Sequence, residues 1–189
     1  ASAYSVFATG GIRHRPYFIG TIHDRDETLL YQHEAESYRV LSPGAAWLTS
    51  TILKRVLEEG GTGANLRTMG FTAPAGGKTG TTNDFFDAWF AGYTSRLSAS
   101  VWVGLDQPGT IMEGAYGGKV AMPIWQDIMG AAQRLGYEFT GIAPPEEVIE
   151  MQLCRGTGQL ANEKCGTAQM VYVEQVPYDL IPREFCRQH

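Results

Sequence analysis

The spacing of apolar residues along the chain changes between two periods. Over residues 42–59 and 122–135 they recur close to the 3.6-residue repeat of an amphipathic helix. Ser42 is suited to cap the first of these helices, and Pro43 to occupy its first turn. Between the helices the period becomes two, which predicts three short strands: 76–82, 86–94 and 98–105. The pattern therefore predicts an α+β fold, in which an antiparallel sheet is flanked by helices.

Weaker patterns surround this centre. Residues 1–9 predict a helix that ends at Gly10-Gly11. A strand starting at Pro16 and a return strand over TLLYQ predict a hairpin with a solvated turn at Asp24-Arg25-Asp26-Glu27. The tail has two strand candidates, VIEMQL and AQMVYVEQV. We expect two parts, residues 1–140 and a C-terminal extension at 141–189.

Aromatic residues on the predicted strands and on the second helix are expected in the core. They lie among alternating or periodic apolar positions, where packing is commoner than a ligand platform. They are Trp89, Phe90, Trp102 and Trp125.

The composition excludes some functions. The chain has 189 residues, 43% of them hydrophobic and 19% charged, enough for one domain with an appendage. The net charge of −5 disfavours a nucleic-acid or anionic-membrane partner, and we expect no nucleic-acid binding. No apolar run approaches the ~18 residues of a membrane span.

Cysteine and histidine spacing gives no metal motif. Three cysteines lie in the last third, without a CxxC or a Cys/His spacing, so we expect no metal site. Their number fits either one disulfide and a free thiol or three buried thiols. The four histidines are scattered among polar neighbours and are interpreted as surface residues: His14, His23, His33 and His189.

The candidate chemistry lies in the stretch PAGGKTGTTNDFF at the start of the first predicted strand. Thr79 and Thr81 share one face of an extended strand, and Gly80 between them leaves the backbone open to a ligand. Two hydroxyls beside backbone N–H groups suit a carboxylate or carbonyl oxygen, and Lys78 adds a positive charge that helps to stabilise an oxyanion. The alternative interpretation is a surface edge strand with solvated side chains.

The K-T-G sequence is an element of penicillin-binding proteins and serine β-lactamases. GGKTGTTNDFFDAWFAGYTSRLSASVWVGLD resembles the corresponding strands in the transpeptidase domain of a class A, bifunctional penicillin-binding protein. ASAYSVFATGGIRHRPYFIGTIHDRDETLLY resembles the segment after the second active-site motif of that family, and the helix from Leu41 is similar to the one before the K-T-G strand. The resemblance covers roughly residues 1–135, and the tail resembles the variable C-terminal extension more loosely.

This resemblance implies acyl transfer. A serine attacks the D-Ala-D-Ala amide of a peptidoglycan stem peptide, D-Ala leaves, and an amine of a neighbouring stem resolves the acyl-enzyme. β-Lactams mimic the donor and trap the serine. Carried over, Lys78 sets the local charge, Thr79 and Thr81 bind the donor carboxylate, and the N–H of Thr81 is an oxyanion donor; Gly80 and Thr82 complete the substrate-binding set. We expect no cofactor.

The chain lacks the other two motifs of the family, Ser-x-x-Lys and Ser-x-Asn. Ser50 and Lys54 are four positions apart rather than three, in the middle of a predicted helix, and Lys54 is interpreted as solvated. The chain therefore contains one wall of the site, and we expect no acylation of it alone. The alternative is a non-catalytic peptidoglycan- or protein-binding module that keeps this wall; a β-lactamase or receptor relative is a weaker rival.

The resemblance also implies a context. The parent works in peptidoglycan synthesis and cell shape, is a target in antibiotic resistance, and acts outside the cytoplasmic membrane, anchored by a segment absent here. In that compartment a Cys165–Cys186 disulfide is plausible, worth about 3 kcal/mol in the chain-entropy model, with Cys154 left free. The strand at 98–105 is expected to have a bare edge, which either the rest of the domain covers or a second copy binds.

Overall fold

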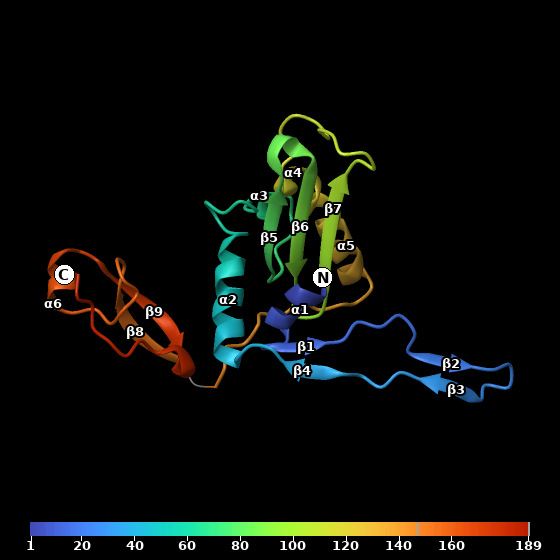
Figure 1. The fold of residues 1–189 in the computed structure, drawn as a ribbon, viewed down its shortest axis with the longest axis horizontal. Helices are drawn as coiled ribbons and strands as arrows, with labels where there is room; N and C mark the ends of the chain where they lie inside the picture. The colour runs from blue at the N-terminus through green and yellow to red at the C-terminus, as the bar shows by residue number, and fades with distance from the viewer. Residues whose placement is uncertain (147, 189) are drawn as a thin grey trace.

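A three-stranded antiparallel sheet forms the centre of the molecule (Figure 1). The computed structural model describes residues 1–146 and 148–188. The strands β5 (Gly76–Thr81), β6 (Asp87–Tyr93) and β7 (Ser98–Gly104) lie in the order β5-β6-β7. The predicted strands and the antiparallel arrangement are confirmed.

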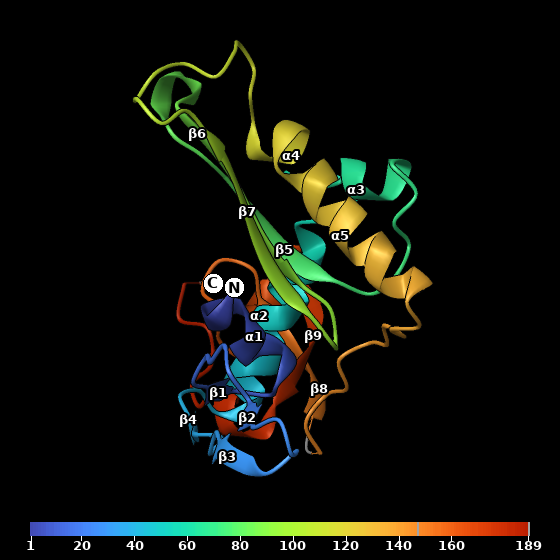
Figure 2. The ribbon, with the colours of Figure 1, turned by 90° about the vertical axis from the view of Figure 1, so that its right-hand side faces the viewer.

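Helix α5 (Met122–Arg134) covers one face of this sheet (Figure 2). Trp125 is fully buried and makes edge-to-face contacts with Phe90 of β6, at 5.3 Å between ring centroids, and with Phe71, at 5.4 Å. This face holds the main core, whose burial supplies most of the hydrophobic stabilisation. Its buried members are Leu57, Leu66, Phe71, Ala75, Phe90, Val101, Ala121, Met122, Trp125 and Met129.

The opposite face is covered at one end by α1 (Ser2–Ala8) and α2 (Pro43–Arg55). The Ser42 hydroxyl caps α2 by accepting from the backbone N–H of Ala45 at 3.2 Å, as its position predicts. The helix ends at Arg55 rather than at residue 59, because the chain turns there and directs Leu57 into the core.

The other end of that face is open in the described chain. Trp89 and Trp102 are cross-strand partners there, with ring centroids 6.3 Å apart, and each side chain is 45% exposed. The expectation that they are core residues is wrong, whereas Phe90 and Trp125 are fully buried as predicted. The strands place Phe90 on the face under α5 and the two tryptophans on the face that α1 and α2 only partly cover.

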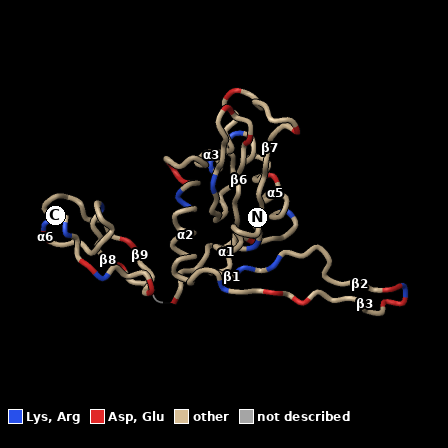
Figure 3. The backbone as a smooth tube through the Cα atoms, in the orientation of Figure 1, with Lys and Arg blue, Asp and Glu red and all other residues tan. Residues whose placement is uncertain are grey.

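A two-stranded arm extends from the sheet domain (Figure 1). Its inner part pairs β1 (Ile12–His14) with β4 (Ser37–Arg39), and its outer part pairs β2 (Thr21–His23) with β3 (Leu29–Gln32). The predicted hairpin is present, but its first strand begins at Thr21 and not at Pro16. The turn at the tip is exposed, and Figure 3 shows the charged residues at that end of the arm.

The C-terminal part forms a separate small unit beside α2 (Figure 1). It pairs β8 (Val148–Cys154) with β9 (Val171–Pro177), as the sequence predicts, and adds α6 (Glu163–Thr167). Arg55 of α2 forms an ion pair with Glu174 of β9 at 3.1 Å. We call residues 148–188 the tail unit.

Short helical turns complete the fold. They are α3 (Asn65–Thr68), α4 (Gly117–Val120), and the 3-10 turns η1 (Asn83–Phe85) and η2 (Tyr178–Leu180). The described residues contain no helix with the length and apolar character needed to cross a bilayer.

Candidate active-site wall along strand β5

The outer edge of β5 has outward-facing backbone groups at two threonines that no neighbouring strand pairs in the described chain. Thr82 donates its N–H to the carbonyl of Asp87 at 3.0 Å, which makes these residues a hydrogen-bonded pair. Hydrogen-bonded and non-hydrogen-bonded pairs alternate along an antiparallel ladder. Thr81 and Thr79 therefore belong to non-hydrogen-bonded pairs, and their N–H and C=O groups point away from β6. No other described strand lies on that side, so these groups face the open edge.

Lys78 bends around this edge. Its Cβ points to the face that carries Trp89, opposite to the side chain of Thr79. The ammonium nevertheless donates to the Thr79 carbonyl at 2.8 Å and lies 3.4 Å from the Thr79 hydroxyl. An exposed positive charge is thereby held beside the outward-facing backbone of the strand.

The two threonine hydroxyls point to the same side, as predicted. Thr79 donates to the hydroxyl of Thr62 at 2.9 Å, and Thr81 accepts from the N–H of Gly117 at 3.1 Å. Because a hydroxyl has one proton, the Thr81 proton is still available to an anionic ligand. Gly117 approaches so closely that a Cβ there would lie 2.1 Å from the Trp89 carbonyl oxygen.

Thr82 and Gly80 have mainly local contacts. The backbone N–H of Asp87 donates to the Thr82 hydroxyl at 2.7 Å, which closes the turn between β5 and β6. Gly80 pairs with Trp89, where a Cβ would be 3.2 Å from that side chain. Their assignment to the substrate-binding set stays a prediction.

A shallow cavity adjoins the end of this wall. Its volume is about 560 Å³, and its lining residues are Thr81, Thr82, Asn83, Asp84, Phe86 and Asp87. It lies at the turn between β5 and β6, so the strand edge and this hollow form one continuous candidate surface.

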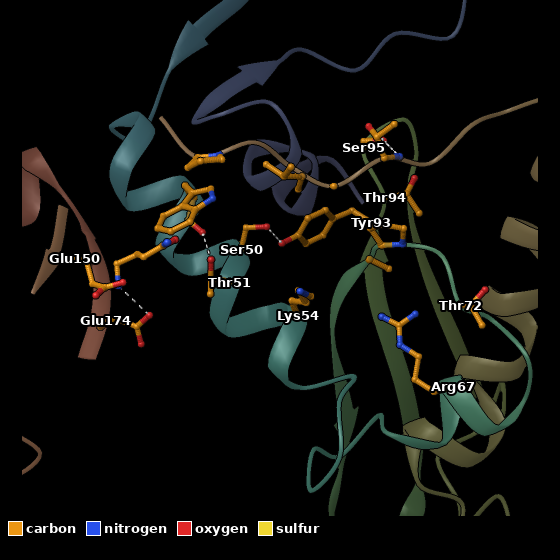
Figure 4. Close-up of a pocket in the computed structure, with 18 of the residues that line it drawn as sticks. Ser50, Thr51, Lys54, Arg67, Thr72, Tyr93, Thr94, Ser95, Glu150 and Glu174 are labelled. Atoms are coloured by element: carbon orange, nitrogen blue, oxygen red, sulfur yellow. Dashed lines mark hydrogen bonds between the residues drawn. The ribbon is translucent and has the colours of Figure 1, made fainter. Parts of the chain in front are cut away.

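A larger cavity of about 680 Å³ lies elsewhere, between α2, the end of β6 and the tail unit (Figure 4). Ser50 in it is buried and accepts a hydrogen bond from Tyr93 at 2.8 Å. Burial raises the pKa of Tyr93 to about 12, against a smaller lowering by the Ser50 hydrogen bond. Lys54 is solvated, as predicted, and its ammonium lies 3.6 Å from the carboxylate of Glu58. Ser50 and Lys54 therefore form no nucleophile pair.

The three cysteines of the tail unit meet at one point. The Sγ atoms of Cys154, Cys165 and Cys186 all lie within 4.8 Å of one another, and the residues are buried and not joined by a disulfide in this structure. The backbone at Asn162 lowers the pKa of the Cys165 thiol, but burial and the two neighbouring thiols outweigh it, so this pKa lies above its ordinary value. Sequence spacing did not predict this cluster, because the three residues come from separate elements. The predicted Cys165–Cys186 disulfide stays a prediction.

Comparison with known proteins points to one family. Residues 1–130 match the family model of the penicillin binding protein transpeptidase domain. Penicillin-binding protein 1A of Neisseria gonorrhoeae is 37% identical over 79% of the chain and 19% of its own length. The protein of that name from Clostridium tetani is 34% identical over 100% of the chain and 24% of its own length.

Solved structures give the same result. Penicillin-binding protein 1A from Haemophilus influenzae matches with a TM-score of 0.77 and 26% identity, over 98% of this chain and 32% of that one. Penicillin-binding protein A of M. tuberculosis, solved as an imipenem acyl-enzyme complex, shares the fold with a TM-score of 0.57 at 20% identity, over 70% of this chain and 30% of that one.

The fold and the matched residues define a transpeptidase domain of the penicillin-binding class. The chain belongs to the penicillin-binding protein transpeptidase family, and it spans about a fifth to a quarter of the curated relatives it matches. It carries the part of that domain that contains the K-T-G strand. The predicted fold class and family are confirmed.

Proposed function

We propose that this chain supplies the K-T-G wall of a peptidoglycan D,D-transpeptidase whose nucleophilic serine lies elsewhere on the parent polypeptide. The proposal rests on the open edge of β5, where Lys78 lies beside the outward backbone groups of Thr79 and Thr81. The family match does not favour the alternative of a non-catalytic binding module.

Each group on this edge has a task in acyl transfer. The Thr81 hydroxyl, whose oxygen already accepts from Gly117, donates its proton to the carboxylate of the donor stem peptide. The Thr79 hydroxyl joins it after turning away from Thr62. The outward N–H of Thr81 stabilises the oxyanion that forms when serine attacks the D-Ala-D-Ala carbonyl. The positive charge of Lys78 stabilises the two anionic groups at this edge, the donor carboxylate and the oxyanion.

The reaction proceeds in two transfers. Attack by the serine forms an ester and expels D-Ala, and the amine of a second stem peptide then takes the acyl group and frees the serine. A β-lactam follows the first transfer only, because its leaving group stays attached to the acylated serine.

The setting of the parent follows from this chemistry. Peptidoglycan stem peptides lie outside the cytoplasmic membrane, so the domain acts on that side, and we assign the membrane anchor and a glycosyltransferase activity to parts of the parent outside this chain. Relevance to β-lactam resistance follows if the edge of β5 contacts the drug.

Labelling with a fluorescent penicillin tests the proposal. The full-length parent is expected to form a covalent adduct that survives denaturation, whereas the 189-residue chain alone is expected to form none. A parent that binds peptidoglycan but never acylates would overturn the transpeptidase assignment in favour of the binding module. An adduct on the isolated chain would show that the nucleophile lies within it.

A further inference from the structure

The tail unit has a core too small to hold it together by apolar burial. Its buried apolar side chains, within the part that the structure describes, are mainly Leu153, Val176 and the three cysteines. At about forty residues, a unit of this size ordinarily needs disulfides, a metal ion or a partner for stability.

The cysteine sulfurs occupy the centre of that core. Cys154 ends β8, Cys165 lies on α6, and Cys186 lies near the chain end, yet their Sγ atoms lie within 4.8 Å of one another. Three thiolates bound to one tetrahedral zinc ion lie about 3.8 Å apart, from a Zn–S distance of about 2.3 Å. Since 4.8 Å is the upper limit of their separations, a contraction of at most about 1 Å brings the sulfurs to that spacing.

The backbone around each sulfur is already fixed. The Asn162 side chain accepts from the N–H of Cys165 at 3.0 Å and donates to the carbonyl of Cys186 at 2.8 Å. The carbonyl of Cys154 accepts from Gly158 at 2.8 Å, in a tight turn where Gly158 has φ +69°. Asn162 therefore ties the backbone of Cys165 to that of Cys186 and holds these two residues side by side.

We propose that Cys154, Cys165 and Cys186 are ligands of one structural zinc ion that holds the tail unit folded. On binding, the three thiols release their protons to solvent and no electron is transferred. A disulfide joins only two of the sulfurs and leaves a third buried thiol in contact with the bridge, whereas the metal uses all three. The fourth ligand is left unassigned, since His189, three positions after Cys186 in the sequence, lies outside the described residues.

Metal content of the full-length parent tests this inference. We expect one zinc ion per chain to be lost in Cys165→Ser and kept in Met170→Leu. Met170 packs against the sulfur cluster but is not one of its members, so this matched variant disturbs packing without removing a ligand. Equal zinc content in the parent and in Cys165→Ser overturns the proposal.

Two further measurements use the unchanged protein, so that they do not depend on the folding of Cys165→Ser. Cobalt(II) added to the reduced, chelator-treated protein is expected to give the near-ultraviolet absorption of thiolate–cobalt bonds, and its absence overturns the proposal. Chelation is expected to speed amide hydrogen exchange in β8 and β9 and to leave β5 to β7 unchanged; no change in β8 and β9 overturns it. A metal-free native protein whose peptide map contains a Cys165–Cys186 disulfide would also overturn the proposal.

Discussion

Lys78 contributes through its charge at an exposed strand edge. Its ammonium is held 2.8 Å from the Thr79 carbonyl, on the same strand edge as the Thr81 N–H assigned to the oxyanion. Replacing Lys78 by Ala in the full-length parent is expected to lower the rate of penicillin acylation by about 10²–10³, as the loss of one electrostatic group in an oxyanion site does. The measurement is the second-order labelling rate with fluorescent penicillin.

Lys54→Ala is the matched control for this change. The residue is also an exposed lysine, with its side chain 58% accessible, but it lies on α2 away from the β5 edge. The labelling rate of Lys54→Ala should equal that of the unaltered parent. If Lys78→Ala and Lys54→Ala were labelled at the same rate, Lys78 would have no role in acylation.

Tyr93 makes the free energy of unfolding depend on pH in the alkaline range. Its pKa is raised by burial from 10.0 to about 12, so the native state favours the protonated phenol. This stabilisation is complete below pH 10 and is lost as the pH rises through 12. The free energy of unfolding should therefore fall between these values more steeply in the unaltered chain than in Tyr93→Phe, as measured by denaturant titration at each pH.

Tyr93→Phe should also lower the free energy of unfolding at neutral pH. Phe at position 93 cannot donate to Ser50, so it should be less stable by about 1 kcal/mol, the typical net value of one hydrogen bond. Parallel pH profiles for the two proteins would show that the Tyr93 phenol does not titrate within the fold.

The sequence identified the residues of the wall better than their partners. Alternation along an extended strand was enough to place Thr79 and Thr81 on one side. Their contacts with Thr62 and Gly117 were not predictable, because both partners come from segments in which no periodic pattern indicates a position beside β5. The cysteine cluster was missed for the same reason.

Among the elements, the fit of α4 against the sheet depends on one glycine. A Cβ at Gly117 would lie 2.1 Å from the Trp89 carbonyl oxygen and 2.6 Å from that of Gly80, both rigid backbone atoms. We expect Gly117→Ala to destabilise the domain by about 1–3 kcal/mol, as overpacking does, and to slow acylation by shifting the partner of Thr81. Thermal unfolding and labelling of the full-length parent measure the two effects.

Gly130→Ala provides the comparison. Gly130 lies in α5, where the nearest atom to an added Cβ is the flexible end of Arg134 at 3.6 Å. Alanine there should stabilise the helix by about 0.5–1 kcal/mol. If Gly117→Ala and Gly130→Ala change the stability in the same direction, the close approach of α4 to the sheet is not the reason for glycine at position 117.

The central elements were predictable because their periods are regular. The strands of the sheet and α5 begin and end within a few residues of their predicted bounds, since their apolar spacing matches the faces they bury. The inner strands β1 and β4 of the arm were not predicted: their residues are mostly exposed, so no alternating apolar pattern marks them.

At the scale of the whole molecule, the sheet has an uncovered side. β7 is an edge strand, and Trp89 and Trp102 form an exposed aromatic pair beside it. Ala1 contacts Ser98 and Ser100 on β7, which leaves the part of the edge beyond Ser100 without a described neighbour. We propose that the rest of the transpeptidase domain packs on this side in the parent.

The isolated chain should accordingly self-associate. Replacing Trp89 and Trp102 by lysine is expected to shift it toward monomer, because the charges oppose burial of this face. Sedimentation velocity across a range of concentrations measures the shift. A monomeric unaltered chain at every concentration, with no second polypeptide present, would contradict this expectation.

The opposite orientation of Lys78 and Thr79 on β5 has a consequence for mutations that change chain length. The turn between Thr82 and Asp87 fixes the register in which β5 pairs with β6. Removing one residue between them would exchange inward and outward side chains along a whole strand, whereas removing two would restore the original parity. A one-residue deletion in this turn should therefore be tolerated only where the turn re-forms with a different number of residues and keeps the pairing of β5 with β6.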